Sequence, residues 1–184
     1  MPRYYRRRYT RVVRPKKKWA SNIALWNNSS LSSSFSTTLV ANSAQAASPT
    51  PSILKVGNFK MSADIVFKLN AAIGVENYNP ASVGYIIYVP EGWEDTSTAY
   101  DNLIVKHPEW IMATKTLGSS VTGSGSVFNV ETINVSTRLK RNLNSGDKVA
   151  FYLKLNSYVP QEGLPAMLES MKITGTCRYW TCSN

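Results

Sequence analysis

The sequence predicts an all-β protein, and three of its properties lead to this expectation. Ser, Thr and Asn together account for 51 of the 184 residues, and these types are unfavourable inside helices but common in strands and turns. Aromatic residues make up 11% of the chain and favour pleated surfaces. Several segments alternate apolar and polar residues with a period of two, which is the pattern of a strand buried on one face. We therefore expect a single eight-stranded jelly roll, a β-sandwich, preceded by a disordered basic tail.

The first region, residues 1–18, is a basic tail. It carries nine cationic side chains and no acidic one, so it repels itself and is expected to be disordered without a partner. The planar fork of arginine suits phosphate, and interleaved aromatic rings can stack on unpaired bases. The tail is therefore predicted to bind nucleic acid, with a nuclear-import signal or a solubilising role as alternatives. The expected contacts are Arg3, Tyr4, Tyr5, Arg6, Arg7, Arg8, Tyr9, Arg11, Arg14, Lys16, Lys17, Lys18 and Trp19.

The next region, residues 19–34, is rich in Ser and Asn and is expected to be an irregular connector. Residues 35–184 are expected to form the folded domain. After residue 18 the chain has 12 basic and 11 acidic side chains, the total of 21 less the nine in the tail against all 11 acids. The domain is therefore nearly neutral, which lets copies pack side by side without repulsion.

Within the domain, alternation and turn residues divide the chain into eight or nine strand segments. We place them at 35–47, 53–60, 61–70, 83–89, 102–106, 110–116, 126–139, 147–156 and 170–180. The short stretch 165–170 has a helical composition. The predicted inward-facing residues are Met61, Ala63, Ile65, Phe67 and Leu69, then Val149, Phe151, Leu153 and Leu155, then Met171, Ile173, Cys177 and Tyr179. Segment 83–89 is apolar on both faces, which indicates a central strand or one covered twice.

The segment 126–139 changes its apolar parity between Val130 and Ile133. One inserted residue at 131–132 would return both halves to a single face, so a β-bulge is predicted there. We then expect Phe128, Val130, Ile133 and Val135 all to be buried.

The composition excludes several classes of protein. There is no apolar run of 18 residues to span a membrane, and no apolar stretch follows the basic N-terminus as a secretory signal requires. Two cysteines cannot form a disulfide scaffold, and Cys177 and Cys182 are expected on opposite faces of one strand.

Catalytic and metal chemistry find little support in the sequence. His107 is the single histidine and lies in a predicted turn, and Glu94 with Asp95 is typical of a solvated loop, although the pair could touch a divalent cation. The glycines of residues 122–126 lack the Gly-Lys-Ser/Thr of a phosphate loop. We expect no enzyme, no catalytic residues, no metal ligands and no cofactor.

Large aromatic residues next to turns and strand ends are candidates for contacts between subunits, because exposed rings are a liability on a soluble monomer. The candidates are Tyr78, Trp93, Tyr100 and Trp180.

Four strings, taken in order, carry a resemblance to a known family. They are YVPEGW at 88–93, HPEWIMA at 107–113, STRLKRNLNSGD at 136–147 and RYWT at 178–181. Together with the basic tail, they resemble the capsid proteins of circovirus-like, Rep-encoding circular single-stranded DNA viruses.

The resemblance implies a jelly roll that self-assembles into a T=1 icosahedral shell, a 60-mer, and a tail that packages circular single-stranded DNA. It also implies recognition by the host nuclear-import machinery, and hence a location in the virion and the host nucleus. Two alternatives remain. One is a cellular, non-specific nucleic-acid-binding β-sandwich with the same tail. The other is a secreted lectin-like sandwich with a heparin-binding tail.

Overall fold

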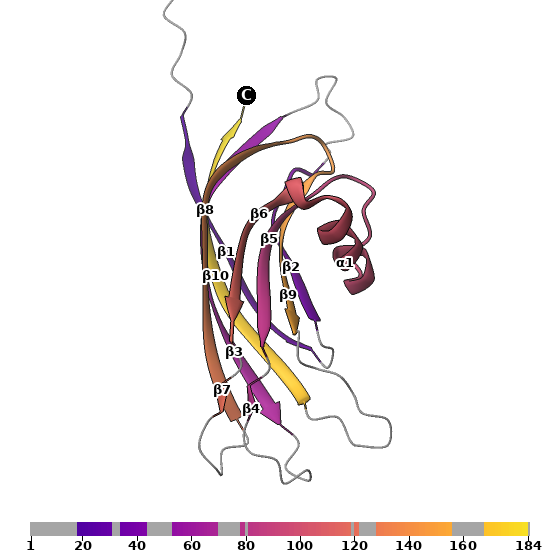
Figure 1. Ribbon diagram of the computed structural model, residues 1–184. Helices are drawn as coiled ribbons and strands as arrows, with labels where there is room; N and C mark the ends of the chain where they lie inside the picture. The colour runs from indigo at the N-terminus through magenta and orange to yellow at the C-terminus, as the bar shows by residue number, and fades with distance from the viewer. Residues whose placement is uncertain are drawn as a thin grey trace, which may run out of the picture.

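The chain folds into strands that run in alternating directions, and one short helix interrupts them (Figure 1). The computed structural model describes residues 18–30, 34–43, 53–69, 78–79, 81–118, 120–121, 128–155 and 168–183. The elements are β1 Ala20–Ser30, β2 Ser34–Ala41, β3 Leu54–Leu69, β4 Tyr78–Asn79, β5 Ser82–Val89, α1 Ser97–Lys106, the 3-10 turn η2 Pro108–Trp110, β6 Ile111–Leu117, β7 Ser120–Val121, β8 Phe128–Leu143, β9 Lys148–Leu155 and β10 Leu168–Ser183.

The strands form two antiparallel sheets of four that lie face to face. The order β1-β10-β3-β8 makes one sheet, which we call the open sheet, and β2-β9-β5-β6 makes the other, which we call the covered sheet. Strands β4 and β7 pair separately. This arrangement confirms the predicted all-β sandwich.

The core lies between the two sheets and follows the predicted alternation. Met61, Ala63, Ile65 and Phe67 of β3 are buried, as are Val149, Phe151, Leu153 and Leu155 of β9. On β10 the buried set is Met171, Ile173 and Cys177, with Tyr179 partly buried against Phe59. These inward-facing side chains join both sheets in one apolar cluster. The side chain of Leu69 lies outside the described residues.

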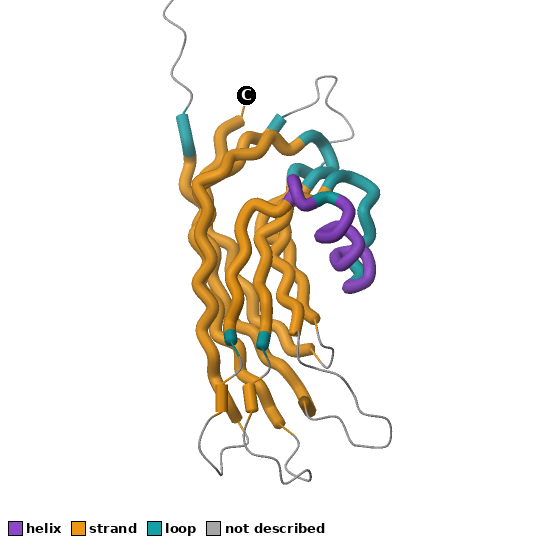
Figure 2. The backbone as a smooth tube through the Cα atoms, viewed as in Figure 1, coloured by secondary structure: helices purple, strands orange, loops and turns teal. Residues whose placement is uncertain are grey.

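Helix α1 lies on the outer face of the covered sheet (Figure 2). Its Tyr100 and Leu103 are buried against Ala150 and Tyr152 of β9. This explains why segment 83–89 is apolar on both faces. The predicted strand at 102–106 is wrong, because those residues form the last part of α1.

Two further predictions of local structure need correction. Residues 20–30, expected to be irregular, form strand β1, which pairs along its whole length with β10. The helical composition at 165–170 is also misleading, since residues 168–170 begin strand β10. Residues 165–167 lie outside the described part of the chain.

The predicted bulge at 131–132 is wrong. The register between β3 and β8 is continuous from Phe128 to Thr137. Val130 faces outward and is 62% exposed, whereas Ile133 and Val135 are buried, so the strand keeps one parity and needs no inserted residue. The irregularity lies instead at Asn58 of β3, whose φ of 54° is left-handed, opposite residues 138–139 of β8. The side chain of Phe128 is outside the described residues.

Candidate nucleic-acid interface

The outer face of the open sheet is strongly basic. Register and alternation place seven cationic side chains on it, and no described helix packs over them. These are Lys55, Lys60, Lys68, Arg138, Lys140, Lys172 and Arg178. Asp64 is the carboxylate that the described register assigns to this face. Seven of the 12 cations that follow residue 18 therefore lie on one surface, which we call the basic face.

One ladder row crosses the centre of the basic face. Ile23 of β1 is opposite Arg178 of β10, which is opposite Lys60 of β3. Neighbouring strands are about 4.8 Å apart, so the two cations are adjacent. Within the described residues, neither is held in an ion pair. Two such neighbours repel each other, and a polyanion laid over them relieves that repulsion.

A hollow next to this row contains an aromatic ring. It has a volume of about 470 Å³ and is lined by Lys60, Ser136, Arg138 and Trp180. Trp180 is 38% exposed and lies opposite Gly57, which in turn lies opposite Lys140. A Cβ on Gly57 would come within 2.8 Å of Lys140 Cγ, so glycine leaves room for the Lys140 side chain on this face. A ring beside several cations is a typical platform for an unpaired base.

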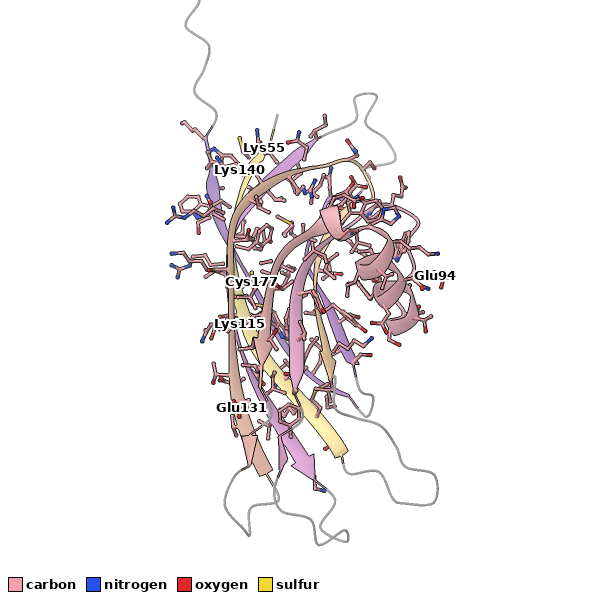
Figure 3. The ribbon with its side chains drawn as sticks, viewed as in Figure 1. Lys55, Glu94, Lys115, Glu131, Lys140 and Cys177 are labelled. Carbon is pink, nitrogen blue, oxygen red and sulfur yellow. The ribbon has the colours of Figure 1, made fainter. Side chains whose placement is uncertain are left out.

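The basic face continues toward the predicted tail. The Nζ of Lys140 lies 5.2 Å from the centre of the Trp19 ring, a cation–π contact, and Lys18 is exposed next to it. Lys55 and Lys140 lie at the end of the sheet where β1 begins, as Figure 3 shows. The remaining predicted tail contacts, from Arg3 to Lys17 and including Tyr4, Tyr5 and Tyr9, lie outside the described residues.

The aromatic residues predicted at subunit contacts occupy different environments. Trp180 lies on the basic face. Tyr100 lies in α1, is only 1% exposed and stacks on Tyr152 with ring centres 5.0 Å apart, so the expectation that its ring is exposed is wrong. Trp93 is half-buried: its Nε1 donates to the Ala99 carbonyl at 3.1 Å, and its ring meets Trp110 edge-on. The Tyr78 side chain is outside the described residues.

The acidic groups gather on the opposite side, around α1. Tyr100 donates to Asp95, and Lys148 pairs with the same carboxylate at 2.5 Å. Burial alone would raise the pKa of Asp95, but these two hydrogen bonds outweigh it and hold the pKa below its usual value. Burial, with the hydrogen bond to Asp95, raises the pKa of Tyr100 well above that of a free phenol.

The histidine and the two cysteines, which are the candidate catalytic groups, are packed against or buried among other residues of the fold. His107 ends α1, stacks on Trp110 with ring centres 3.9 Å apart and lies 3.1 Å from Glu109. Cys177 and Cys182 are both buried and are not joined to each other, and burial raises the pKa of the Cys177 thiol to about 12. The described residues hold no group of three or more His, Cys, Asp or Glu side chains placed to bind a metal. Nor do they include a helix long and apolar enough to cross a membrane.

Comparison with known proteins gives no family. No family model matches the chain, and no curated protein matches it. Among solved structures, two crystal structures of a CocE/NonD family hydrolase from Staphylococcus aureus are similar, each with a TM-score of 0.40. Sequence identity is 9% and 11%, with 92% and 90% of this chain covered. The chain spans about a third of those hydrolases, 37% and 33% of their lengths.

This comparison corrects one expectation. The sequence led us to expect no enzyme, yet the similar structures are hydrolases, so that expectation is withdrawn. A TM-score of 0.40 is too low to transfer an activity to this chain.

The sequence did not reveal the basic face. Its cations are spread from Lys55 to Arg178, and only strand register brings them together. The one signal available was the alternation of β3 and β10, which assigns Lys60, Lys172 and Arg178 to the side away from the core.

Proposed function

We propose that this chain is a viral capsid subunit that self-assembles into a small icosahedral shell and packages circular single-stranded DNA. The observation that carries the proposal is the continuity of the basic face with the basic tail. Lys18, Lys140 and Lys55 lie at one end of the open sheet, where the tail joins β1. A polyanion can therefore contact both surfaces of one subunit.

The separation of charge supports an orientation in such a shell. The basic face is on one side of the sandwich, and exposed Glu94 lies on the side of α1, as Figure 3 shows, with exposed Glu109 in the turn that follows that helix. A subunit whose basic face points inward meets the genome there and presents its α1 side outward, where Asp95 and Asp101 are paired with Lys148 and Lys154. In this proposal the sandwich has jelly-roll connectivity, the shell is a T=1 60-mer, and the tail also serves as the nuclear-import signal.

The affinity of such a surface for nucleic acid is largely independent of sequence. Lysine and arginine on the face of a sheet contact phosphates, and the described open sheet consists of strands, with no helix of its own to enter a groove and read base edges.

Purified full-length protein tests the proposal through its mass and its nucleic-acid content. We expect particles of megadalton mass by light scattering, closed shells by negative-stain microscopy and an absorbance ratio typical of bound nucleic acid. A cellular nucleic-acid-binding sandwich would instead give species of about one subunit mass, 20.5 kDa, or small multiples of it. That result, under conditions in which the tail is intact, would overturn the capsid proposal.

A further inference from the structure

Two aliphatic side chains are exposed beside the cations of the basic face. Ile23 and Leu25 of β1 point outward, with 59% and 74% of their surface accessible. Their neighbours on β10 are Arg178 and Thr176. Exposed aliphatic side chains on an edge strand are unfavourable in water unless something covers them.

The two side chains form one wall of a shallow trough. The trough has a volume of about 520 Å³, and its lining includes Ile23, Leu25, Lys60, Ser62, Thr176 and Arg178. Its apolar wall comes from β1 and its cations come from β10 and β3. Its hydroxyl groups belong to Thr176 and Ser62, which lie opposite each other in the ladder row that also contains Leu25. Lys60 also lines the hollow that contains Trp180, so the two depressions adjoin.

The chemistry of the trough fits a strand of unpaired nucleic acid. Arg178 and Lys60 would hold phosphate, while Ile23 and Leu25 offer an apolar surface to base faces. The hydroxyls of Ser62 and Thr176 can donate to or accept from base edges. In a duplex the base faces are stacked inside the helix, so a duplex could use only the cations.

Other occupants fit less well. A second copy of this face would bring seven cations against seven, and two aliphatic side chains cover far less than the roughly 800 Å² per partner of a stable interface. A membrane surface would suit protruding apolar residues, whereas these two line a depression.

We propose that the trough of the open sheet is a second nucleic-acid-binding site, separate from the tail, and that it selects unpaired strands by accepting their bases. The proposal extends the proposed function by placing the genome on the sheet, but binding at the trough does not require a shell.

The test uses the full chain and two labelled oligonucleotides of equal length, an oligothymidylate of about 20 nucleotides and its abasic counterpart. Both carry the same phosphates, and only the first has bases. Fluorescence anisotropy at several salt concentrations gives the ratio of the two affinities. The variant Ile23→Thr with Leu25→Thr removes the apolar wall while keeping residues that favour strands. Val105→Thr is the matched control, because Val105 is 80% exposed on α1, away from the basic face.

We expect the double variant to reduce the preference for oligothymidylate about fivefold or more, and the control to leave it unchanged. Lys60→Gln with Arg178→Gln should weaken the binding of both oligonucleotides equally. Light-induced cross-linking of an iodouracil-containing oligonucleotide should map to Trp180 or to the trough.

An unchanged preference in the double variant would overturn the proposal. If that double variant also loses the binding of the original protein to phosphatidylcholine vesicles that contain about one third phosphatidylserine, the trough is a membrane surface instead. Particle formation, scored by microscopy, is a separate measurement. If no particles form, the capsid proposal is overturned but the proposed binding at the trough is not. If normal particles form and the preference is unchanged in the double variant, the trough proposal is overturned but the capsid proposal is not.

Discussion

Asp147 is the residue on which one end of the sandwich depends. It is 4% exposed and accepts hydrogen bonds from Tyr88 Oη at 2.8 Å, from the Glu91 amide at 3.1 Å and from the Asn144 amide at 2.8 Å. These three donors connect the turn between β8 and β9 to the segment that follows β5. A buried carboxylate needs such partners, and the donors equally need the carboxylate.

Asp147→Ala should therefore destabilise the protein by about 2–4 kcal/mol, because it leaves three donors near the core without an acceptor. Urea unfolding measures this change. Asp64→Ala is the matched control: Asp64 is exposed and accepts one hydrogen bond from Thr132, so its loss should cost about 0.5 kcal/mol or less. Equal effects of the two substitutions would contradict this role for Asp147.

Tyr88 makes the free energy of unfolding depend on pH in the alkaline range. Burial, together with the hydrogen bond to Asp147, raises the pKa of Tyr88 to about 12. An unfolded tyrosine releases its proton near pH 10, whereas the folded one retains it. The contribution of Tyr88 is thus fully present below about pH 10 and is lost as the pH rises from there toward 12. Absorbance titration at alkaline pH should show one late-ionising phenol fewer in Tyr88→Phe, and that variant should lose stability less steeply across this range.

At this scale the sequence predicts the apolar residues well and the polar ones poorly. Alternation alone identified Phe67, Phe151 and Ile173 as buried. The role of Asp147 could not be predicted, because Tyr88 and the Glu91 amide are more than 50 positions away in the chain.

Among the elements, α1 depends on a single capping contact. The Thr96 side chain accepts from the Ala99 amide at 3.2 Å, and no acidic residue lies in the first turn to assist it. Thr96→Ala should cost about 1 kcal/mol and should loosen the stacking of Tyr100 on Tyr152. Near-ultraviolet circular dichroism and urea unfolding measure the two effects. Thr98→Ala, inside the first turn and also exposed, is the control and should change little.

Two of the elements that the sequence assigned wrongly share a physical cause. The run Leu103, Ile104 and Val105 resembles a strand, but Tyr100, Leu103 and Ile104 follow helical spacing, and Tyr152 on the outer face of β9 gives that helix a surface to cover. In β1 the alternation is hidden, because Ile23 and Leu25 face outward while Ala24 and Trp26 face the core. Both errors arise where a tertiary contact outweighs local pattern.

At the scale of the whole molecule, charge is divided between the tail and one face of the sandwich. Deleting residues 1–17 should leave the sandwich folded and remove most of the nucleic acid that co-purifies with the protein. It should also reduce the slope of log K against log salt, by about 0.7 for each phosphate that the tail would otherwise neutralise. The residual binding should be weakened further by Lys60→Gln with Arg178→Gln, and not by Lys106→Gln, because Lys106 lies on α1, away from the basic face (Figure 2). An unchanged absorbance ratio in the truncated protein would contradict the assignment of the tail.

The tail could be predicted from composition because its charges are consecutive. The rest of the chain appeared neutral, because its 12 basic and 11 acidic side chains nearly balance and the sequence does not show where they lie on the surface. Only the pairing of β10 with β3 and of β3 with β8 shows that the charges are separated.

The open sheet also places the beginning of the described chain against its end. Strand β1 pairs with β10, and Asn22 hydrogen-bonds Thr181 across 159 positions. During synthesis, β1 leaves the ribosome before β10, and β10 is its partner in the open sheet. Such a contact closes late, because distant residues must meet before any of it forms. Ile23 on the first strand and Arg178 on the last come together only at that moment, so a growing chain carries a basic tail but no trough. The ability to accept bases on the sheet is thus acquired only after β10 has been synthesised, and a ribosome-bound fragment ending before β10 would lack it.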